Sequence, residues 1–227
     1  LLAGALAPAS GRVELDGRDV RQVARIEMAR RVAMVPQETQ LAFEYSVLEI
    51  ALMGRYPHLG PFELEGPEDV AIARNALEAT GTLSLARRPF ATLSGGEKQR
   101  VVIASALAQF EPRASRRTAD PAAPARPAAS EPPQLLLLDE PTASLDLHYQ
   151  LEVVSLLRRL NRDRDLTMVV STHDLNVAAP LRQESIVTEL LVTLCVRIAL
   201  RIGRVDRVHR RRLQQHLRPV LHRAKRR

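Results

Sequence analysis

Apolar and polar positions along the chain follow two different periods, one typical of strands and one typical of helices. Residues 11–20 (GRVELDGRDV) alternate between apolar and polar around Asp16-Gly17, which is the pattern of a β-hairpin. Three short apolar runs, Val32–Val35, Leu135–Leu138 and Thr167–Val170, are too brief for free-standing helices and suit strands buried on both faces of a parallel sheet. The pattern therefore predicts an α/β fold.

From Phe43 to about Gln109 the apolar positions recur with the period of a helix. Asp69–Ala79 and Glu97–Ala108 are the clearest amphipathic stretches, because their apolar residues gather on one helical face. We therefore expect a helical subdomain over about residues 40–110, between the first core strand and the second.

Pro112–Pro133 breaks this pattern. Six of these 22 residues are proline and seven are alanine, with scattered arginine and serine. A segment of this composition cannot bury a core, so we expect a disordered or polyproline-like loop. A tolerated surface loop is favoured over a functional insertion.

Two segments carry candidate chemistry, and the first is Leu93–Arg100 (LSGGEKQR). Ser94 and Glu97 have the spacing of a capping box, which predicts that a helix begins here. Gly95 and Gly96 would let a phosphate approach the N–H groups at the positive end of that helix. Taken alone, this spacing is that of an ordinary helix start.

The second segment places two carboxylates at the end of the leucine strand. Asp139 and Glu140 directly follow Leu135–Leu138, at the edge where open α/β sheets bind ligands. An aspartate at that edge can hold Mg²⁺ through water, and a neighbouring glutamate can polarise an attacking water. Together the two segments predict ATP hydrolysis.

These residues resemble the motifs of a known family. Leu93–Arg100 and Leu135–Pro141 resemble the signature and Walker B motifs of ABC transporter ATP-binding subunits. Three more segments follow the family's order: Val35–Glu38 resembles the Q-loop, Ser144–Asp146 the D-loop, and Ser171–Asp174 the switch histidine. Each of the three is weak alone, but five motifs in register between residues 35 and 174 form a specific match.

The resemblance implies a role for each motif, with ATP and Mg²⁺ as cofactors. Gln37 would sense Mg²⁺ and the attacking water, Asp139 would serve Mg²⁺, Glu140 would be the general base, and His173 would contact the γ-phosphate. Further residues would bind the nucleotide held by the opposite subunit or cross the dimer interface: Ser94, Gly95, Gly96, Glu97 and Asp146.

The resemblance also implies a fold and partners. Residues 1–179 would form a partial P-loop NTPase core with a helical subdomain and a remnant of the antiparallel β subdomain. Tyr45–Ile50 and Gly54–His58 are similar to the branch that serves importers of iron-siderophore, haem and cobalamin. Such a chain works with a second ATP-binding subunit and membrane permease subunits, as a cytoplasmic protein on the inner face of the cell membrane.

The sequence contains no P-loop string G-x-x-x-x-G-K-[ST], the element with which the family holds the nucleotide phosphates. Its two lysines, Lys98 and Lys225, both lie outside glycine-rich loops. Leu1–Gly4 resembles the end of the helix that follows a P-loop. We therefore expect that the chain begins before or within the Walker A helix and is inactive alone.

Composition adds limits on the class of protein. The chain has 227 residues, of which 45% are hydrophobic, and a single cysteine, Cys195, which excludes an internal disulfide. No run of 18 or more residues is free of charge, so a cytosolic, non-spanning protein is favoured. The net charge of +7 divides into +10 for residues 180–227 and −3 for residues 1–179.

The resemblance stops after Ala179, and residues 180–227 form a basic tail. Three origins of this tail stand open: a frameshifted or misassembled reading of an ABC gene, a solvated basic tail, and a selected binding tail. The tail lacks interleaved aromatic residues and any recognisable reader module, so a nucleic-acid partner is not favoured.

Two alternatives to an importer subunit remain open at this point. The first is a soluble ABC-type ATPase that acts on DNA or the ribosome through the Arg-rich tail. Such proteins usually have tandem ATPase halves, a long coiled coil or zinc-binding cysteines, and the sequence shows none of these. The second is an inactive regulatory or remnant chain, which follows from the lack of a P-loop.

Overall fold

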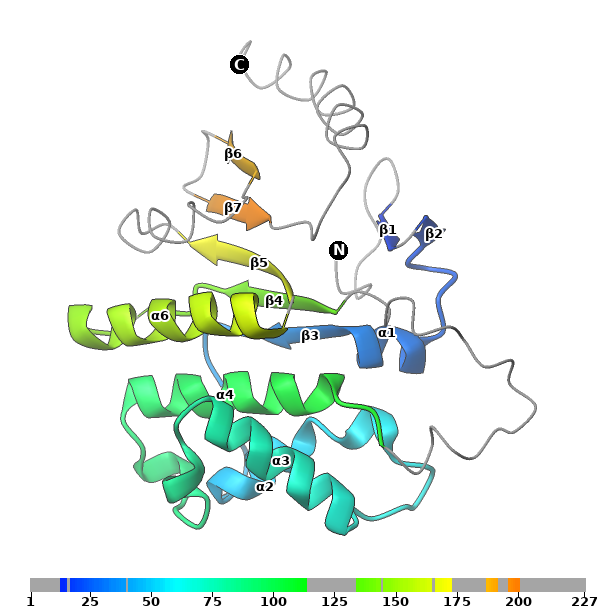
Figure 1. Ribbon diagram of the computed structural model, residues 1–227, viewed down its shortest axis with the longest axis vertical. Coiled ribbons are helices and arrows are strands. Elements are labelled where there is room, and N and C mark those ends of the chain that lie inside the picture. Colours follow the sequence, from blue (N-terminus) through cyan, green and yellow to red (C-terminus); the bar gives the residue numbers. More distant parts are fainter. Residues whose placement is uncertain are drawn as a thin grey trace.

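The computed structural model describes residues 13–15, 17–39, 41–113, 134–143, 145–164, 166–172, 187–191 and 196–200. In these ranges a five-stranded sheet packs against a layer of helices, and a separate two-stranded hairpin is formed (Figure 1). The helices are α1 (Arg25–Arg31), α2 (Val47–Met53), α3 (Pro67–Ala79), α4 (Gly95–Phe110) and α6 (Leu147–Arg164), with 3₁₀ turns η1 (Tyr56–His58), η2 (Leu83–Leu85) and η3 (Phe90–Thr92). No helix in these ranges has the length and apolar content to cross a membrane.

The parallel part of the sheet consists of β3 (Val32–Val35), β4 (Leu135–Asp139) and β5 (Thr167–Thr172), in that order. All three strands were expected from the apolar runs and are confirmed. Leu136 and Leu138 of β4 are 0% and 2% exposed, and Leu137, which faces the other side, is 9% exposed. The central strand is thus buried on both faces, as its unbroken run of leucines predicts.

Two further strands extend the sheet beyond the expected end of the domain at Ala179. Strand β7 (Val196–Leu200) pairs antiparallel with β5, and β6 (Val187–Leu191) pairs antiparallel with β7. The expected boundary at residue 179 therefore does not coincide with the edge of the sheet. Charged residues such as Glu189 and Arg197 interrupt the apolar runs here, so the sequence does not mark these segments as buried strands. Antiparallel strands tolerate such residues because they can alternate apolar and polar positions.

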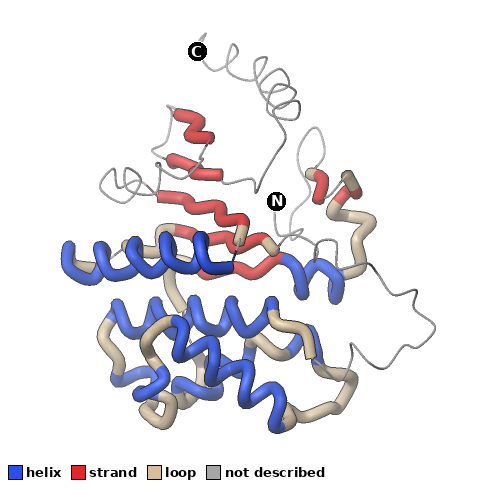
Figure 2. The backbone as a smooth tube through the Cα atoms, in the orientation of Figure 1, coloured by secondary structure: helices blue, strands red, loops and turns tan. Residues whose placement is uncertain are grey.

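Helix α4 lies between the sheet and the helices α2 and α3, as Figure 2 shows. The helices expected over residues 69–79 and 97–108 are confirmed as α3 and α4. The main core joins α2, α3, α4 and α6 to one face of β3, β4 and β5. Its fully buried members include Val35, Leu77, Leu107, Leu138 and Leu157.

The opposite face of the sheet is covered by the start of the described chain. Strands β1 (Glu14–Leu15) and β2 (Arg18–Asp19) form the hairpin expected over residues 11–20, although Asp16 of its turn lies outside the described residues. Val20, Val23 and Met28 pack with Leu137 and Val169 in a second, smaller cluster. The hairpin segment thus completes the burial of β4 and β5.

The strands and helices are oriented so that several termini meet on one side. The arrows of β3, β4 and β5 point toward the side of the molecule where α4 and α6 begin, on the left of Figure 1. The carboxyl ends of the parallel strands and the amino ends of these two helices therefore share that side. This is where a parallel α/β sheet usually binds its ligand.

The loop expected over residues 112–133 wrongly includes Arg113, which belongs to the packed helical layer. Arg113 is only 8% exposed, and its guanidinium forms ion pairs with Glu63 and with the fully buried Asp69. Arg113 is therefore part of the packed helical layer. The sequence does not reveal this role of Arg113, because its neighbours have the composition of a loop and its partners lie more than forty residues away in sequence. Residues 114–133 lie outside the described residues.

Candidate functional site

Gln37 and Glu140 meet at the carboxyl ends of two adjacent strands. Val35, the last residue of β3, pairs with Leu138 of β4 in the parallel ladder, so the segments that follow both strands leave the sheet side by side. The Gln37 Nε2 donates a hydrogen bond to Glu140 Oε2 at 3.3 Å. The structure thus joins two predicted site residues that are 103 positions apart.

Glu140 has an unusual backbone conformation. Its φ is +44°, in the left-handed region that non-glycine residues rarely adopt. Two backbone hydrogen bonds hold this conformation: the Glu140 N–H donates to Ser171 O, and the Ala143 N–H donates to Glu140 O, both at 2.9 Å. The chain therefore turns sharply at the end of β4 and fixes the direction in which the Glu140 side chain leaves the backbone.

Asp139 is the last residue of β4 and pairs with Ser171 of β5, and it is exposed. Within the described ranges, no three His, Cys, Asp or Glu side chains gather into a metal site. An exposed carboxylate near an amide suits Mg²⁺, because this ion usually keeps several waters and binds substrate phosphates rather than a closed protein cage. The side chains of Asp139 and Gln37, the two residues expected at the metal, are of this kind and fit a magnesium ion that arrives with a nucleotide.

Helix α4 begins as the capping box predicts. The Ser94 Oγ accepts a hydrogen bond from the Glu97 N–H at 3.3 Å, and the Glu97 carboxylate accepts one from the Ser94 N–H at 2.8 Å. This second bond is the main reason that the pKa of Glu97 lies below its usual value. Ser94 and Gly95 are exposed, while Gly96 is buried. An exposed helix start of this kind suits an anion.

The segment after β4 leads into a second capped helix. The Asp146 Oδ1 accepts a hydrogen bond from the Tyr149 N–H at 3.1 Å, and the Asp146 carbonyl accepts one from the Gln150 N–H at 2.9 Å. Asp146 therefore begins α6 and is exposed at its start. Of the other predicted residues, Ser144 and His173 lie outside the described part of the chain.

Sequence reasoning missed Tyr149, and it named Leu145 only as part of the D-loop resemblance, without its contact with the signature segment. A Cβ atom added at Gly95 would lie 3.0 Å from Leu145 Cδ2, and one added at Gly96 would lie 2.7 Å from Tyr149 Cδ1. Leu145 and Tyr149 therefore cover the first turn of α4. Paired glycines at the start of a helix are a signal of close approach, but the sequence does not reveal what approaches them.

Comparison with known proteins places this geometry in a family. The family model for ABC transporters matches residues 1–112. The hemin import ATP-binding protein HmuV of Methylobacillus flagellatus is 35% identical over 212 residues, which cover 86% of the chain and 72% of that relative. The chain belongs to the ABC transporter ATP-binding family. The resemblance drawn from the five motifs is thus confirmed.

Other members of the ABC family show how far the match extends. The cobalamin import ATP-binding protein BtuD of Halobacterium salinarum is 37% identical over 81% of the chain, which spans only 40% of the length of that relative. The dimeric structure of a bacterial ABC transporter cassette matches with 27% identity and a TM-score of 0.57, over 78% of the chain and 69% of the cassette. The α/β ABC ATPase fold expected from the sequence is confirmed.

Proposed function

We propose that this ABC chain is the ATP-binding and ATP-hydrolysing subunit of an importer for a metal chelate of the iron-siderophore, haem or cobalamin kind. The observation that carries the proposal is the contact between the Gln37 amide and the Glu140 carboxylate beside Asp139, at the carboxyl ends of parallel strands. The relatives described as hemin and cobalamin import ATP-binding proteins support the class of transported molecule.

Glu140 is the general base in this proposal. Its carboxylate accepts a proton from a water molecule as the water oxygen attacks the γ-phosphorus of ATP, the bond to the β–γ bridging oxygen breaks, and ADP leaves. The Gln37 amide, already within hydrogen-bond range of Glu140, orients that carboxylate and the water. Asp139 and Gln37 would hold Mg²⁺, which would neutralise phosphate charge when bound, and His173 would contact the γ-phosphate.

The proposed active unit is a dimer on a membrane permease, at the inner face of the cell membrane. Each composite site takes a P-loop from one subunit and the segment Ser94–Gly96, with Glu97, from the other. Asp146 lies at the interface between the subunits. ATP holds the two subunits together, and hydrolysis releases them.

The test supplies the P-loop that the 227-residue sequence does not contain. The P-loop segment of a related ATP-binding subunit is fused ahead of Leu1, and Mg-dependent ATP turnover and Mg-ATP binding are measured. We expect Glu140→Gln to lower kcat by about 100-fold or more, because an amide cannot take the proton, while Mg-ATP binding changes less than about twofold. The unfused chain gives background turnover only.

The matched control is Glu78→Gln, the same change at an exposed position of α3, which leaves turnover unchanged. A fused protein in which Glu140→Gln hydrolyses ATP at the unmutated rate contradicts the assignment of Glu140. A fused protein that binds no Mg-ATP contradicts the proposed function as a whole.

A further inference from the structure

The signature segment of α4 is packed against the segment that begins α6. At Gly96 there is no room for a side chain, because Tyr149 Cδ1 and Cγ lie 2.7 and 2.9 Å from the position of a Cβ on this glycine. The space at Gly95 is tight, since Leu145 Cδ2 lies 3.0 Å from the position of a Cβ there. Real Cβ atoms do not approach other atoms as closely as the two Tyr149 atoms would approach, so a methyl group at Gly96 would push the Tyr149 ring or the helix start aside.

Tyr149 is itself held in place by its own helix start. Its N–H donates to the Asp146 carboxylate at 3.1 Å. The next residue, Gln150, donates from its backbone to Asp146 O at 2.9 Å and from its side chain to Leu145 O at 3.1 Å. Hydrogen bonds within the segment Leu145–Gln150 therefore fix its conformation independently of α4. The segment can act as a rigid support for the first turn of α4.

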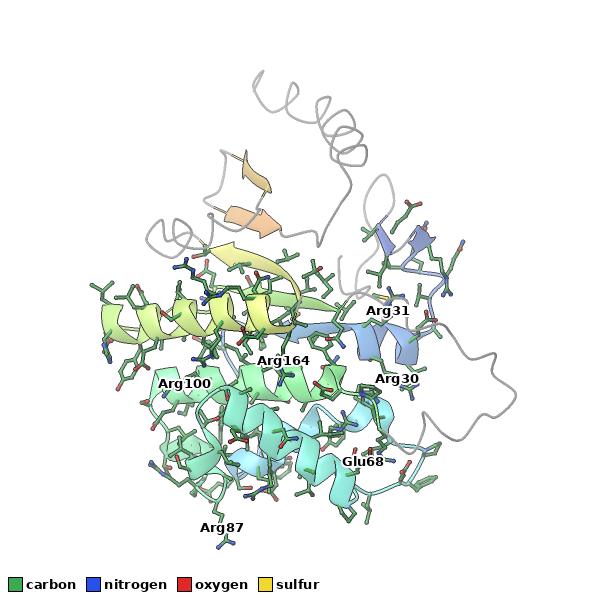
Figure 3. All side chains as sticks on the ribbon, in the orientation of Figure 1. Arg30, Arg31, Glu68, Arg87, Arg100 and Arg164 are labelled. Carbon is green, nitrogen blue, oxygen red and sulfur yellow. The ribbon has the colours of Figure 1, made fainter. Side chains whose placement is uncertain are left out.

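The contact continues along both helices. Arg100 lies four residues after Gly96 and Glu152 three residues after Tyr149, so each pair shares one helical face. The Arg100 Nη1 forms an ion pair with Glu152 Oε2 at 2.8 Å, and Figure 3 shows Arg100 between α4 and α6. Leu107 and Leu157 belong to the main core farther along the two helices. The two helices thus meet in a seam that runs from their amino ends into the core.

We propose that Tyr149 is a positioning residue for the signature segment: its ring sets the place of the first turn of α4, and so of the N–H groups that bind nucleotide phosphate. This inference rests on the proposed function, in which Ser94–Gly96 complete the site of the opposite subunit. It gives Gly96 a second reason to lack a side chain. The glycine has to admit the phosphate on one side and the Tyr149 ring of its own chain on the other.

The first experiment measures amide hydrogen exchange in the full chain, at Glu97 and Lys98 in the first turn of α4. Tyr149→Phe keeps the ring and leaves exchange within about twofold of the unmutated chain. Tyr149→Ala removes the ring, and Gly96→Ala displaces it, so each accelerates exchange by about tenfold. The double variant Gly96→Ala/Tyr149→Ala exchanges more slowly than Gly96→Ala alone, because the two closest ring atoms are removed and only the Cβ of residue 149, at 3.1 Å, still faces the added methyl group.

The matched control is Leu147→Ala, at the start of α6, where the leucine is 63% exposed. It leaves exchange at Glu97 and Lys98 unchanged. Unchanged exchange in Tyr149→Ala overturns the proposal. Simple addition of the two single effects in the double variant also overturns it, because the two residues then do not act through one contact.

The second experiment pairs the full chain with a related subunit that has its own P-loop and a disabled signature motif, so that turnover depends on Ser94–Gly96 of this chain. Tyr149→Ala raises the KM for ATP about fivefold or more and changes kcat less than twofold, because the general base belongs to the partner. Equal KM values in Tyr149→Ala and the unmutated chain contradict the positioning role. If the unmutated chain adds no turnover, the proposed function fails, and the exchange data still decide the role of Tyr149.

Discussion

Glu140 combines a strained backbone with the position expected of a general base. A non-glycine residue in the left-handed region costs about 1–2 kcal/mol, and Glu140 has a φ of +44°. The hydrogen bond from its N–H to Ser171 O and the turn closed at Ala143 maintain this conformation. The strained residue is also the one whose carboxylate accepts the hydrogen bond from Gln37.

We predict that Glu140→Gly is more stable than Glu140→Ala by about 1 kcal/mol, because glycine adopts the left-handed conformation without a steric cost. Urea unfolding of the two variants measures the difference. The control compares the unmutated chain with Ala71→Gly, a change at an exposed position inside α3. There glycine should destabilise the protein by about 1 kcal/mol. Equal stabilities of Glu140→Gly and Glu140→Ala would show that the turn carries no strain.

The sequence predicts some of these single-residue features and conceals others. The approach of Gln37 to Glu140 follows from two apolar runs that form adjacent parallel strands, since the residues after both strands meet at one edge. The positive φ of Glu140 has no such signal, because a glutamate is not a residue that marks a left-handed turn. The contact of Tyr149 with Gly96 is hidden for another reason: it depends on how two helices pack.

At the scale of elements, two helices of the helical layer begin with the same capping box. Ser94 and Glu97 cap α4, and Ser46 and Glu49 cap α2, with the serine hydroxyl accepting at 3.3 Å in both. The hydrogen bond from the serine N–H also lowers the pKa of each glutamate. The two starts thus share one kind of cap, with an additional hydrogen bond at α2 from the Ser46 Oγ to Glu49 Oε2 at 2.7 Å. Only the start of α4 belongs to the proposed nucleotide site.

This shared capping box allows a paired test of Ser94. Ser94→Ala and Ser46→Ala should each lower the free energy of unfolding by about 1 kcal/mol, because each removes one helix cap. Only Ser94→Ala should also raise the KM for ATP of the composite site, since its hydroxyl would contact nucleotide. Thermal unfolding and ATP titration of the paired subunits measure the two effects. Equal KM values in both variants would remove Ser94 from the site.

The strands at the end of the described chain show where sequence patterns fail for whole elements. Strands β3, β4 and β5 are predictable because they are short, apolar and bounded by polar residues. Strands β6 and β7 carry charged residues and follow the last recognised motif, so neither apolar run nor family resemblance predicts them.

At the scale of the whole molecule, a buried ionic network holds the helical layer together. The Arg55 Nε and the Arg113 Nε both donate to Asp69 Oδ1 at 3.0 Å, and the Gly66 N–H donates to Asp69 Oδ2 at 3.0 Å. Burial alone would raise the pKa of Asp69, but the hydrogen bonds from Arg113, Gly66 and Arg55 outweigh burial and hold this pKa well below its usual range.

We predict that Asp69→Asn lowers the free energy of unfolding by about 3–5 kcal/mol at neutral pH, because two buried guanidinium groups lose their counter-charge. A carboxyl group with a lowered pKa stabilises the folded state at pH values above its unfolded pKa of about 3.9. That stability is lost as the pH falls below this value. The difference between the unmutated chain and Asp69→Asn should therefore shrink below about pH 4 in urea unfolding. A difference that stays constant from pH 7 to pH 3 would contradict the prediction.

The same network sets where residues 112–133 can be shortened. Replacing residues 114–133 by a short Gly-Ser linker should change stability by less than about 0.5 kcal/mol, because their composition predicts a loop that buries no core. Including Pro112 and Arg113 in the deletion should cost about 3–5 kcal/mol, because Asp69 then loses a buried ion pair. Thermal unfolding compares the two deletions. Equal melting temperatures would mean that Arg113 contributes nothing to the helical layer.

The contact between Gly96 and Tyr149 also has a consequence for the history of the family. Two positions that share one small space cannot change independently, because a larger residue at one requires a smaller residue at the other. Relatives with alanine at the position of Gly96 should therefore lack an aromatic residue at the position of Tyr149. Substitutions at these two positions, 53 residues apart in sequence, are expected to occur together on the same branches of the family tree.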